Sequence, residues 1–182
     1  MNQTTLTPTE LANEGKTFYS QGNYYESAVA FQNAANGYES AGDQLNAAEM
    51  LNNCAVALLK GKDYPTALQA VEGTDAVFAS AGDIKRQAMA LGNRGAILEG
   101  LGRLDEAIDA YDQSAALFKQ IGEHEMRVPI LRSLSNLQLR TKRPMESLMN
   151  FDAELGEIEG LTTWQKFIRK ILRLQMKLLF RS

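Results

Sequence analysis

An internal repeat of about 40 residues constrains the fold of this chain more than any other feature of its sequence. Closely similar segments surround Gly42, Gly82 and Gly122, which are equally spaced along the chain. A second series of turn-forming residues falls between these glycines, and a small residue follows each of its members at a nearly constant distance: Ala28, Ala67, Ala107 and Ser147. Repeats of this length indicate a stacked array, in which each unit buries its apolar face against the next.

Between the turns the apolar residues recur every three or four positions, as in Ala107, Ile108, Tyr111, Ala115 and Phe118. No segment alternates polar and apolar residues with the period of two that is typical of a half-buried strand. Glycine at the end of a helical segment favours a left-handed cap. We therefore expect helices joined by tight turns, over residues 8–21, 24–41, 44–60, 64–80, 84–101, 104–121, 124–141 and 144–158.

The unit from Gly95 to Tyr111 closely resembles the tetratricopeptide repeat. The small residues expected where paired helices touch are Gly95, Gly102, Ala107 and Ser114, and the larger residues beside them are Leu98, Leu104 and Tyr111. The first unit matches the same pattern with Gly15, Phe18, Gly22, Ala28, Phe31 and Ala35. The second unit is looser, and the fourth is degenerate, with Ser135, Gln138, Lys142, Ser147 and Phe151.

The length of the unit and a second helix that ends at glycine, without the usual proline, resemble the long-helix variant of kinesin light chains, spindle-orientation adaptors and bacterial peptide-sensing regulators. This resemblance covers residues 8–158 and implies an all-α, right-handed superhelical solenoid of about four hairpins. It also implies a concave groove, lined by the first helix of each hairpin, that binds protein partners. Residues 1–7 are expected to be a flexible N-terminus, and residues 161–182 a separate C-terminal helix.

The chain offers little for catalysis, so we expect a binding protein and not an enzyme. Its only cysteine, Cys54, and its only histidine, His124, lie about two repeats apart. We expect the first to be a buried, inert thiol and the second a surface imidazole. No phosphate-binding loop follows a strand, and one cysteine cannot form a cysteine-rich metal site, so neither cofactor nor metal is expected. The start of the sequence has no signal-peptide pattern and no apolar run would span a bilayer, which favours a cytoplasmic location.

Three asparagines recur at one phase of the first helices, at Asn13, Asn53 and Asn93. Asparagine is a mediocre helix former, so its recurrence inside helices needs an explanation. Its amide donates and accepts at once, and in tetratricopeptide proteins similar to this one an asparagine at this phase holds ligand backbone or carboxylate. The alternative is that these amides merely bond between adjacent hairpins, or that they belong to a repeat that was duplicated without selection for them. Secondary candidates for ligand contact are Lys16, Asn52, Lys60, Arg132, Asn136 and Arg140.

Charge is divided unevenly along the chain. Residues 1–160 hold 13 basic and 22 acidic residues, whereas residues 161–182 hold six basic residues and no acidic one. In the C-terminal segment one arc of the predicted helix is apolar, and the opposite arc carries Lys166, Arg169, Lys170, Arg173, Lys177 and Arg181. Three interpretations stay open: a cap on the solenoid, an interfacial helix on an anionic membrane, and a helix that docks into a partner or into this protein's own groove.

These patterns together predict a non-catalytic scaffold or adaptor that binds a peptide or a helix in its groove. The mixed charge of the groove does not favour an acidic C-terminal tail over a longer peptide. One alternative is a membrane-associated assembly factor, recruited by the six cations to anionic lipid on the inner face of a membrane. Another is a structural scaffold that self-assembles through its terminal apolar surfaces. No nucleic-acid partner is expected, because the repeat domain is acidic and the basic stripe is short.

Overall fold

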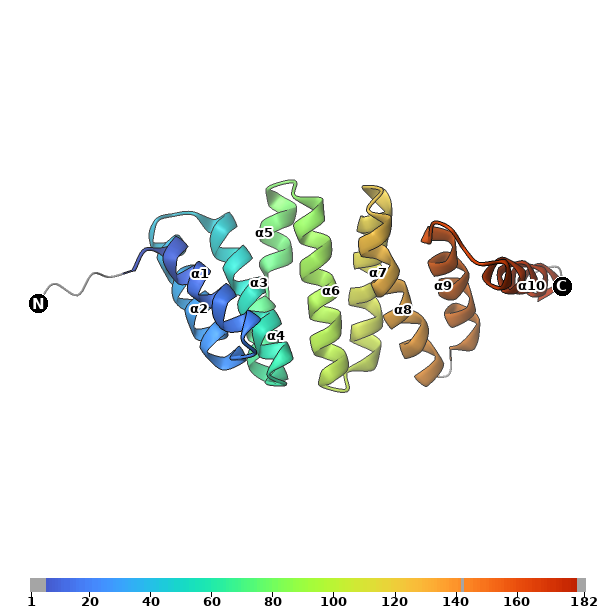
Figure 1. The fold of residues 1–182 in the computed structure, drawn as a ribbon, viewed down its shortest axis with the longest axis horizontal. Helices are drawn as coiled ribbons and strands as arrows, with labels where there is room; N and C mark the ends of the chain where they lie inside the picture. Colours follow the sequence, from blue (N-terminus) through green and yellow to red (C-terminus); the bar gives the residue numbers. More distant parts are fainter. Residues whose placement is uncertain (1–5, 142, 180–182) are drawn as a thin grey trace, which may run out of the picture.

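The computed structural model describes residues 6–141 and 143–179, and within these residues all regular secondary structure is helical. The helices follow one another along the long axis of the molecule, with α1 at one end and α10 at the other (Figure 1). In chain order they are α1 (Pro8–Ser20), α2 (Tyr24–Ser40), α3 (Gln44–Lys60), α4 (Tyr64–Val71), α5 (Thr74–Ser80), α6 (Ile84–Gly100), α7 (Leu104–Gln120), α8 (His124–Arg140), α9 (Pro144–Glu157) and α10 (Thr163–Leu179). The predicted all-α solenoid is confirmed.

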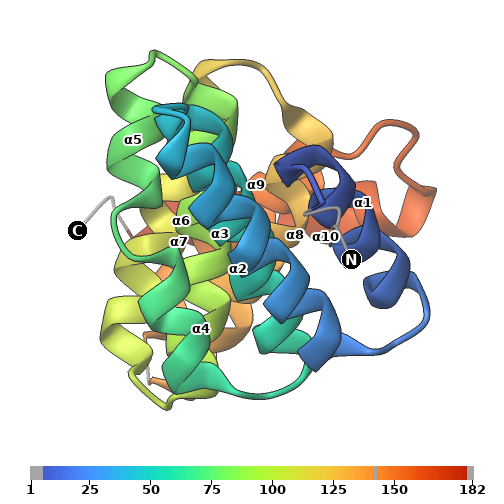
Figure 2. The ribbon, with the colours of Figure 1, turned by 90° about the vertical axis from the view of Figure 1, so that its left-hand side faces the viewer.

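Consecutive helices pair into hairpins, and each hairpin packs on the next. The pairs are α1 with α2, α3 with α4 and α5, α6 with α7, and α8 with α9. Seen from the α1 end, successive hairpins are turned relative to one another, so that α1 and α5 lie on opposite sides of the view (Figure 2). We call α1, α3, α6 and α8 the first helices, because the sequence predicts that they line the binding face.

A residue with a left-handed backbone recurs at equal spacing in the turns between helices. The positions are Gly22, Gly42, Lys62, Gly82, Gly102 and Gly122, with φ between 64° and 80°. Glycine adopts this conformation without strain from a Cβ atom, so the predicted glycine caps are present. In the third turn, however, the left-handed residue is Lys62 and not the adjacent Gly61, which makes this turn the strained member of the series.

The single helix predicted over residues 64–80 is wrong, because the structure divides it into α4 and α5. Glu72 is extended and Gly73 has a left-handed backbone with φ of 77°. The hydroxyl of Thr74 donates a hydrogen bond to the carbonyl oxygen of Val71, 2.8 Å away, at the break. A glycine inside a helix costs about 1 kcal/mol relative to alanine, and a threonine hydroxyl beside it offers the backbone another partner, which explains the interruption.

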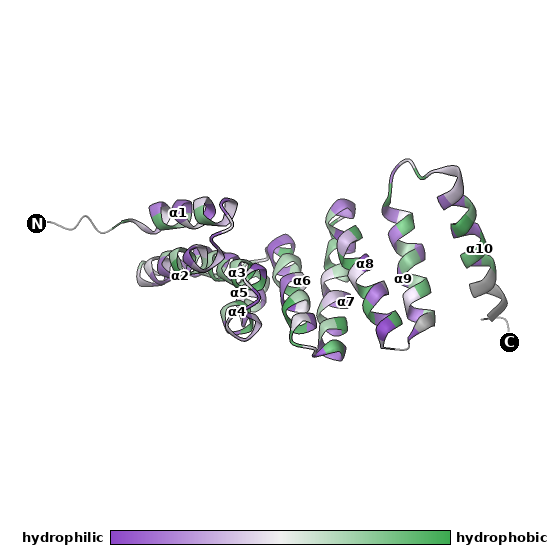
Figure 3. Cartoon of the chain, turned by 60° about the horizontal axis from the view of Figure 1, so that its bottom comes forward, coloured by the Kyte–Doolittle hydropathy of each residue, from purple (hydrophilic) through white to green (hydrophobic). Residues whose placement is uncertain are grey.

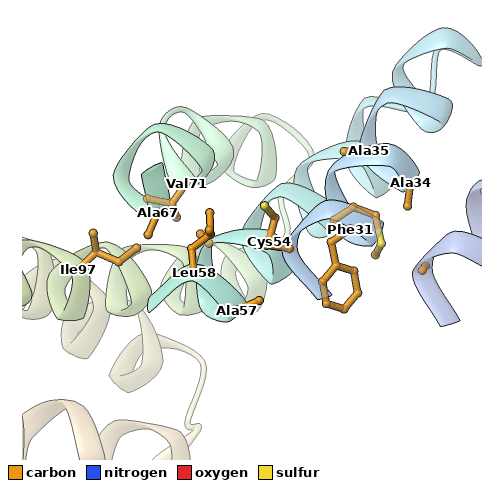
Figure 4. Packing of buried hydrophobic residues seen from close by; sticks show 13 residues of the cluster. Phe31, Ala34, Ala35, Cys54, Ala57, Leu58, Ala67, Val71 and Ile97 are labelled. Carbon is orange, nitrogen blue, oxygen red and sulfur yellow. The ribbon is translucent and has the colours of Figure 1, made fainter. Parts of the chain in front are cut away.

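The core is mostly alanine and leucine, and it contains aromatic rings that lie against glycine backbone. A Cβ atom at Gly15 would lie 2.9 Å from the ring of Phe31, and one at Gly95 would lie 2.7 Å from the ring of Tyr111. Cys54 lies in the same apolar cluster as Phe31, among the alanines and leucines of α2 and α3 (Figure 4). The small residues predicted from the repeat therefore let neighbouring helices approach closely.

The fourth hairpin keeps the fold although its sequence is degenerate. Ser135 on α8 and Ser147 on α9 are both buried, at positions where the third unit has Gly95 and Ala107. The Ser147 hydroxyl donates to the carbonyl oxygen of Ser135 at 2.8 Å. The single proton of the Ser135 hydroxyl has two acceptors within reach, the Ser147 carbonyl oxygen at 3.1 Å and the Ser147 hydroxyl oxygen at 2.9 Å. Because both hydroxyls have partners, these two polar residues can occupy small core positions.

Candidate functional site

The three recurring asparagines occupy matching places on the first helices but have different surroundings. Asn13 on α1 is exposed, whereas Asn53 on α3 and Asn93 on α6 are half-buried. Asn13 lines a separate hollow, whose other residues are Glu10, Glu14, Thr17 and Phe18. The common phase in the sequence therefore does not produce a common environment.

Asn93 is bound by the preceding first helix. Its amide donates to the side-chain oxygen of Asn52 on α3, at 3.1 Å, and Asn52 itself is only 7% exposed. Asn52, a predicted ligand contact, is thus buried in the protein, and its amide oxygen accepts a hydrogen bond from Asn93. This pair matches the alternative in which the asparagines bond between adjacent hairpins.

Asn53 lacks the partner that Asn93 has. Asn52 precedes Asn93 by 41 residues. The residue 41 positions before Asn53 is Ala12, which is buried and has no polar side chain. No hydrogen bond is recorded between the Asn53 side chain and any other part of the chain that the structure describes. A half-buried amide without a partner can bind a ligand at lower cost than one that must first break an internal bond.

The amide of Asn53 lines a hollow of about 270 Å³ between α1, α2 and α3, which we call the N-terminal hollow. Lys16 and Tyr19 come from α1, Phe31 from α2, and Val56 from the turn of α3 after Asn53. Phe31 is only 3% exposed, and the ring of Tyr19 packs edge-on against Tyr24 at 5.5 Å. The site therefore combines apolar side chains with one amide, one phenol and one ammonium group, a composition typical of ligand-binding pockets.

Salt bridges join successive first helices. The guanidinium of Arg86 on α6 lies 2.8 Å from Glu49 on α3, and that of Arg140 on α8 lies 2.5 Å from Glu99 on α6. Arg140, a predicted ligand contact, is thus paired within the protein. These salt bridges link the first helices to one another, and one of them occupies a charge that the sequence alone assigns to a ligand.

The remaining predicted contacts lie apart from the N-terminal hollow. Lys60 is exposed at the end of α3, and Asn136 is exposed on α8. Arg132 on α8 binds Glu154 on α9 through two of its nitrogens, at 2.9 Å and 2.7 Å. Of the predicted ligand contacts, the structure brings only Lys16 and Asn53 into one hollow. Tyr19, Phe31 and Val56 also line this hollow and are not among the predicted contacts; the sequence assigned Phe31 to packing alone.

The two side chains considered for catalysis lie in separate places. Burial raises the pKa of the Cys54 thiol to about 11, as expected for an inert core cysteine. His124 is mostly exposed at the start of α8 and contacts the carboxylate of Glu157 on α9. Within residues 6–141 and 143–179, no three potential metal-ligating side chains come together.

The basic residues of α10 divide into two groups. Arg169 and Arg173 reach Asp152 on α9, at 3.2 Å and 3.0 Å, although Arg173 remains half-exposed, whereas Lys166 and Lys170 are exposed and have no such ion pair among the residues that the structure describes. The side chain of Lys177 and the whole of Arg181 lie outside the described residues. Asp152 was not singled out from the sequence, because no pattern within residues 161–182 indicates which acidic residue faces them.

The apolar arc of α10 is only partly covered. Leu172 is buried and Ile168 half-buried, while a second set of apolar side chains faces solvent: Trp164, Phe167, Ile171 and Leu174, which are 39–66% exposed. Figure 3 shows α10 beside α9 at the end of the array. No described helix has the length and apolarity needed to cross a membrane.

The stacked hairpins, together with a hollow between the first helices, define a tetratricopeptide-like helical scaffold, a class of protein-interaction proteins. The model of the soluble NSF attachment protein (SNAP) family matches residues 10–151, and the chain belongs to this family. A search among curated protein sequences finds no match.

Two solved structures show the same fold. MamA (residues 41 to the end) from Desulfovibrio magneticus RS-1 is 20% identical, with a TM-score of 0.64 over 82% of this chain and 75% of that one. TPR-like repeats described as kinesin light chain, from Podospora anserina, are 10% identical, with a TM-score of 0.73 over 95% of this chain and 94% of that one. These likenesses confirm the predicted tetratricopeptide-like repeats; at such identities they concern the fold alone.

Proposed function

We propose that this protein is a non-catalytic scaffold that binds a peptide or a helix of a protein partner, anchored in the N-terminal hollow. The observation that carries the proposal is the amide of Asn53, which faces the hollow with no recorded partner in the described part of the chain. The family description, soluble NSF attachment protein, supports a protein as the ligand.

The lining of the hollow indicates how a ligand would bind. An apolar ligand side chain would pack on Phe31 and Val56, while the Asn53 amide would donate to and accept from the ligand backbone. Lys16 would favour a ligand with a carboxylate near the anchored side chain. Asn13 lies one repeat before Asn53 and would extend the contact along α1, whereas Asn93 already donates to Asn52.

Site-specific photo-crosslinking tests this proposal directly. A photoreactive phenylalanine analogue in place of Tyr19 should form a covalent adduct with the partner, because Tyr19 lines the hollow. The same analogue in place of Tyr25, which is 74% exposed on α2 but does not line the hollow, is the matched control. Adducts of one defined protein at residue 19 and not at residue 25 support the proposal. Equal yields, or adducts at residue 25 alone, would reject it.

A second candidate function is recruitment to an anionic membrane through α10. The observation that favours it is the exposure of Lys166 and Lys170 on the same helix as four exposed apolar side chains. Flotation with vesicles that contain an anionic lipid, and not with neutral vesicles, is the expected result, and the binding should weaken as salt rises. Absence of flotation at every salt concentration would exclude this candidate without affecting the first.

A further inference from the structure

The outward side of α10 is a composite surface. Trp164 is 66%, Phe167 52%, Ile171 39% and Leu174 59% exposed, and the rings of Trp164 and Phe167 stack with centroids 5.7 Å apart. We call these four residues the apolar stripe. At 100° per residue they share one arc of the helix, and the exposed Lys166 and Lys170 lie beside that arc.

The helix α9 contacts the side of α10 that lies opposite the apolar stripe. Asp152 is 15% exposed and accepts from Arg169 at 3.2 Å and from Arg173 at 3.0 Å and 3.1 Å. A Cβ atom at Gly156, one helical turn further along α9, would lie 2.5 Å from a terminal nitrogen of Arg169. The absence of a side chain at Gly156 therefore leaves the space that the Arg169 guanidinium occupies.

These contacts determine which side of α10 faces outward. A cap would bury the whole apolar arc and turn the cations to solvent, but here two arginines face α9 and the apolar stripe faces solvent. Exposed apolar groups in a contiguous row are typical of an interaction surface. Two of the six cations considered for membrane recruitment are thus paired with Asp152, whose single negative charge offsets one of their two positive charges.

We infer that α10 lies flat in the interface of an anionic bilayer, with the apolar stripe among the acyl chains and Lys166 and Lys170 at the headgroups. Asp152 is the positioning residue that turns this side outward. The inference rests on the second candidate function and specifies its contact surface. A bilayer fits because tryptophan and phenylalanine beside lysine are typical of interfacial helices, and because no acidic residue follows Glu159.

The experiment uses Trp164, the only tryptophan of the chain, as its probe. The intact 182-residue chain is titrated with vesicles of neutral phosphatidylcholine and with vesicles that also contain phosphatidylserine. A blue shift of Trp164 emission with the anionic vesicles is expected. Phe167→Ser with Leu174→Ser should weaken binding at least tenfold, and Lys166→Gln with Lys170→Gln about thirtyfold at low salt. Tyr25→Ser, at an exposed site on α2, should leave binding unchanged.

The role of Asp152 has its own readout, the dependence of vesicle binding on salt. Asp152→Asn releases Arg169 and Arg173, so more cations can contact lipid and the salt dependence should become steeper. Asp152→Glu should restore the wild-type dependence. If Asp152 only stabilised the fold, helicity would fall in the asparagine variant while the salt dependence of binding stayed unchanged, and the positioning role would be rejected.

The outcomes separate this inference from the candidate function on which it rests. Flotation without a shift of Trp164 emission, and unaffected by the apolar-stripe variants, would leave membrane recruitment in place and overturn the contact surface. Absence of flotation would overturn both. The Trp164 emission could instead shift to the blue without lipid, and more strongly as the protein concentration rises. If light scattering then gives the mass of a dimer, the apolar stripe binds a second copy of the chain, and the inference is overturned.

Discussion

The N-terminal hairpins and the C-terminal end of the solenoid use the same helical plan with different chemistry. In the first and third hairpins an aromatic ring lies on a glycine, Phe31 on Gly15 and Tyr111 on Gly95. At the C-terminal end the contacts are polar: Ser135 with Ser147, and Asp152 with the arginines of α10. The repeat therefore fixes where helices meet, while the means of joining them varies along the array.

Ring-on-glycine packing should tolerate substitution least, because the buried ring cannot move away. Gly95→Ala places a methyl group 2.7 Å from the Tyr111 ring and should lower the free energy of unfolding by roughly 1–3 kcal/mol. Gly156→Ala meets only the flexible end of Arg169, and the gain in helix propensity of about 1 kcal/mol offsets the displacement. Urea denaturation of both variants measures the difference; equal losses would contradict the contrast between the two regions.

The serine pair should contribute less than the ring contacts. Ser135→Ala or Ser147→Ala removes a buried hydroxyl that donates to a carbonyl oxygen, which should cost about 1 kcal/mol. The double variant should cost less than the sum, because the contact between the two hydroxyls is then lost only once. A double-mutant cycle in urea measures this coupling. Strictly additive losses would mean that the hydroxyls do not act as a pair.

The aspartate cap of α6 should make stability sensitive to acid. Hydrogen bonds from the Arg86 backbone N–H and side chain hold the pKa of Asp83 below its usual value. Its contribution is complete above the unfolded pKa of about 3.9 and is lost as pH falls through the lower folded pKa. Asp83→Ala should cost about 1 kcal/mol at pH 7 and flatten this part of the pH profile. A profile of Tm against pH that keeps its acid slope in the variant would reject this assignment.

The smallest expected effect comes from the strained third turn. Lys62 has φ of 64° where five other turns have glycine, so Lys62→Gly should raise the free energy of unfolding by about 0.5–1 kcal/mol. Gly61, with φ of −72°, has an ordinary helical backbone, and Gly61→Ala serves as the matched comparison. Destabilisation by Lys62→Gly in thermal denaturation would show that the lysine side chain contributes more than the strain costs.

Much of the fold could be predicted because the turn signals recur twice in each repeat and the small core positions recur at a constant phase. The helix break at Gly73 was not predicted, because a single glycine inside an otherwise helical pattern does not by itself indicate that the helix ends. Asn53 and Asn93 differ in their hydrogen-bond partners because of the residue that the preceding first helix places at the corresponding position. This residue is Asn52 for Asn93 and Ala12 for Asn53. The orientation of α10 depends on Asp152, which belongs to another helix. The distribution of side chains around α10 alone could therefore not predict this orientation.

The central claim is that Asn53, and not its repeat equivalent Asn93, anchors the ligand. The most direct measurement is the Kd of the crosslinked partner for the wild type, Asn53→Ala and Asn93→Ala, with helicity checked by circular dichroism. We expect Asn53→Ala to weaken binding at least tenfold and Asn93→Ala to change it less than threefold, because the Asn93 amide already donates to Asn52 whereas the Asn53 amide has no partner within the described residues. Equal effects of the two substitutions, or a larger effect at Asn93, would contradict the claim.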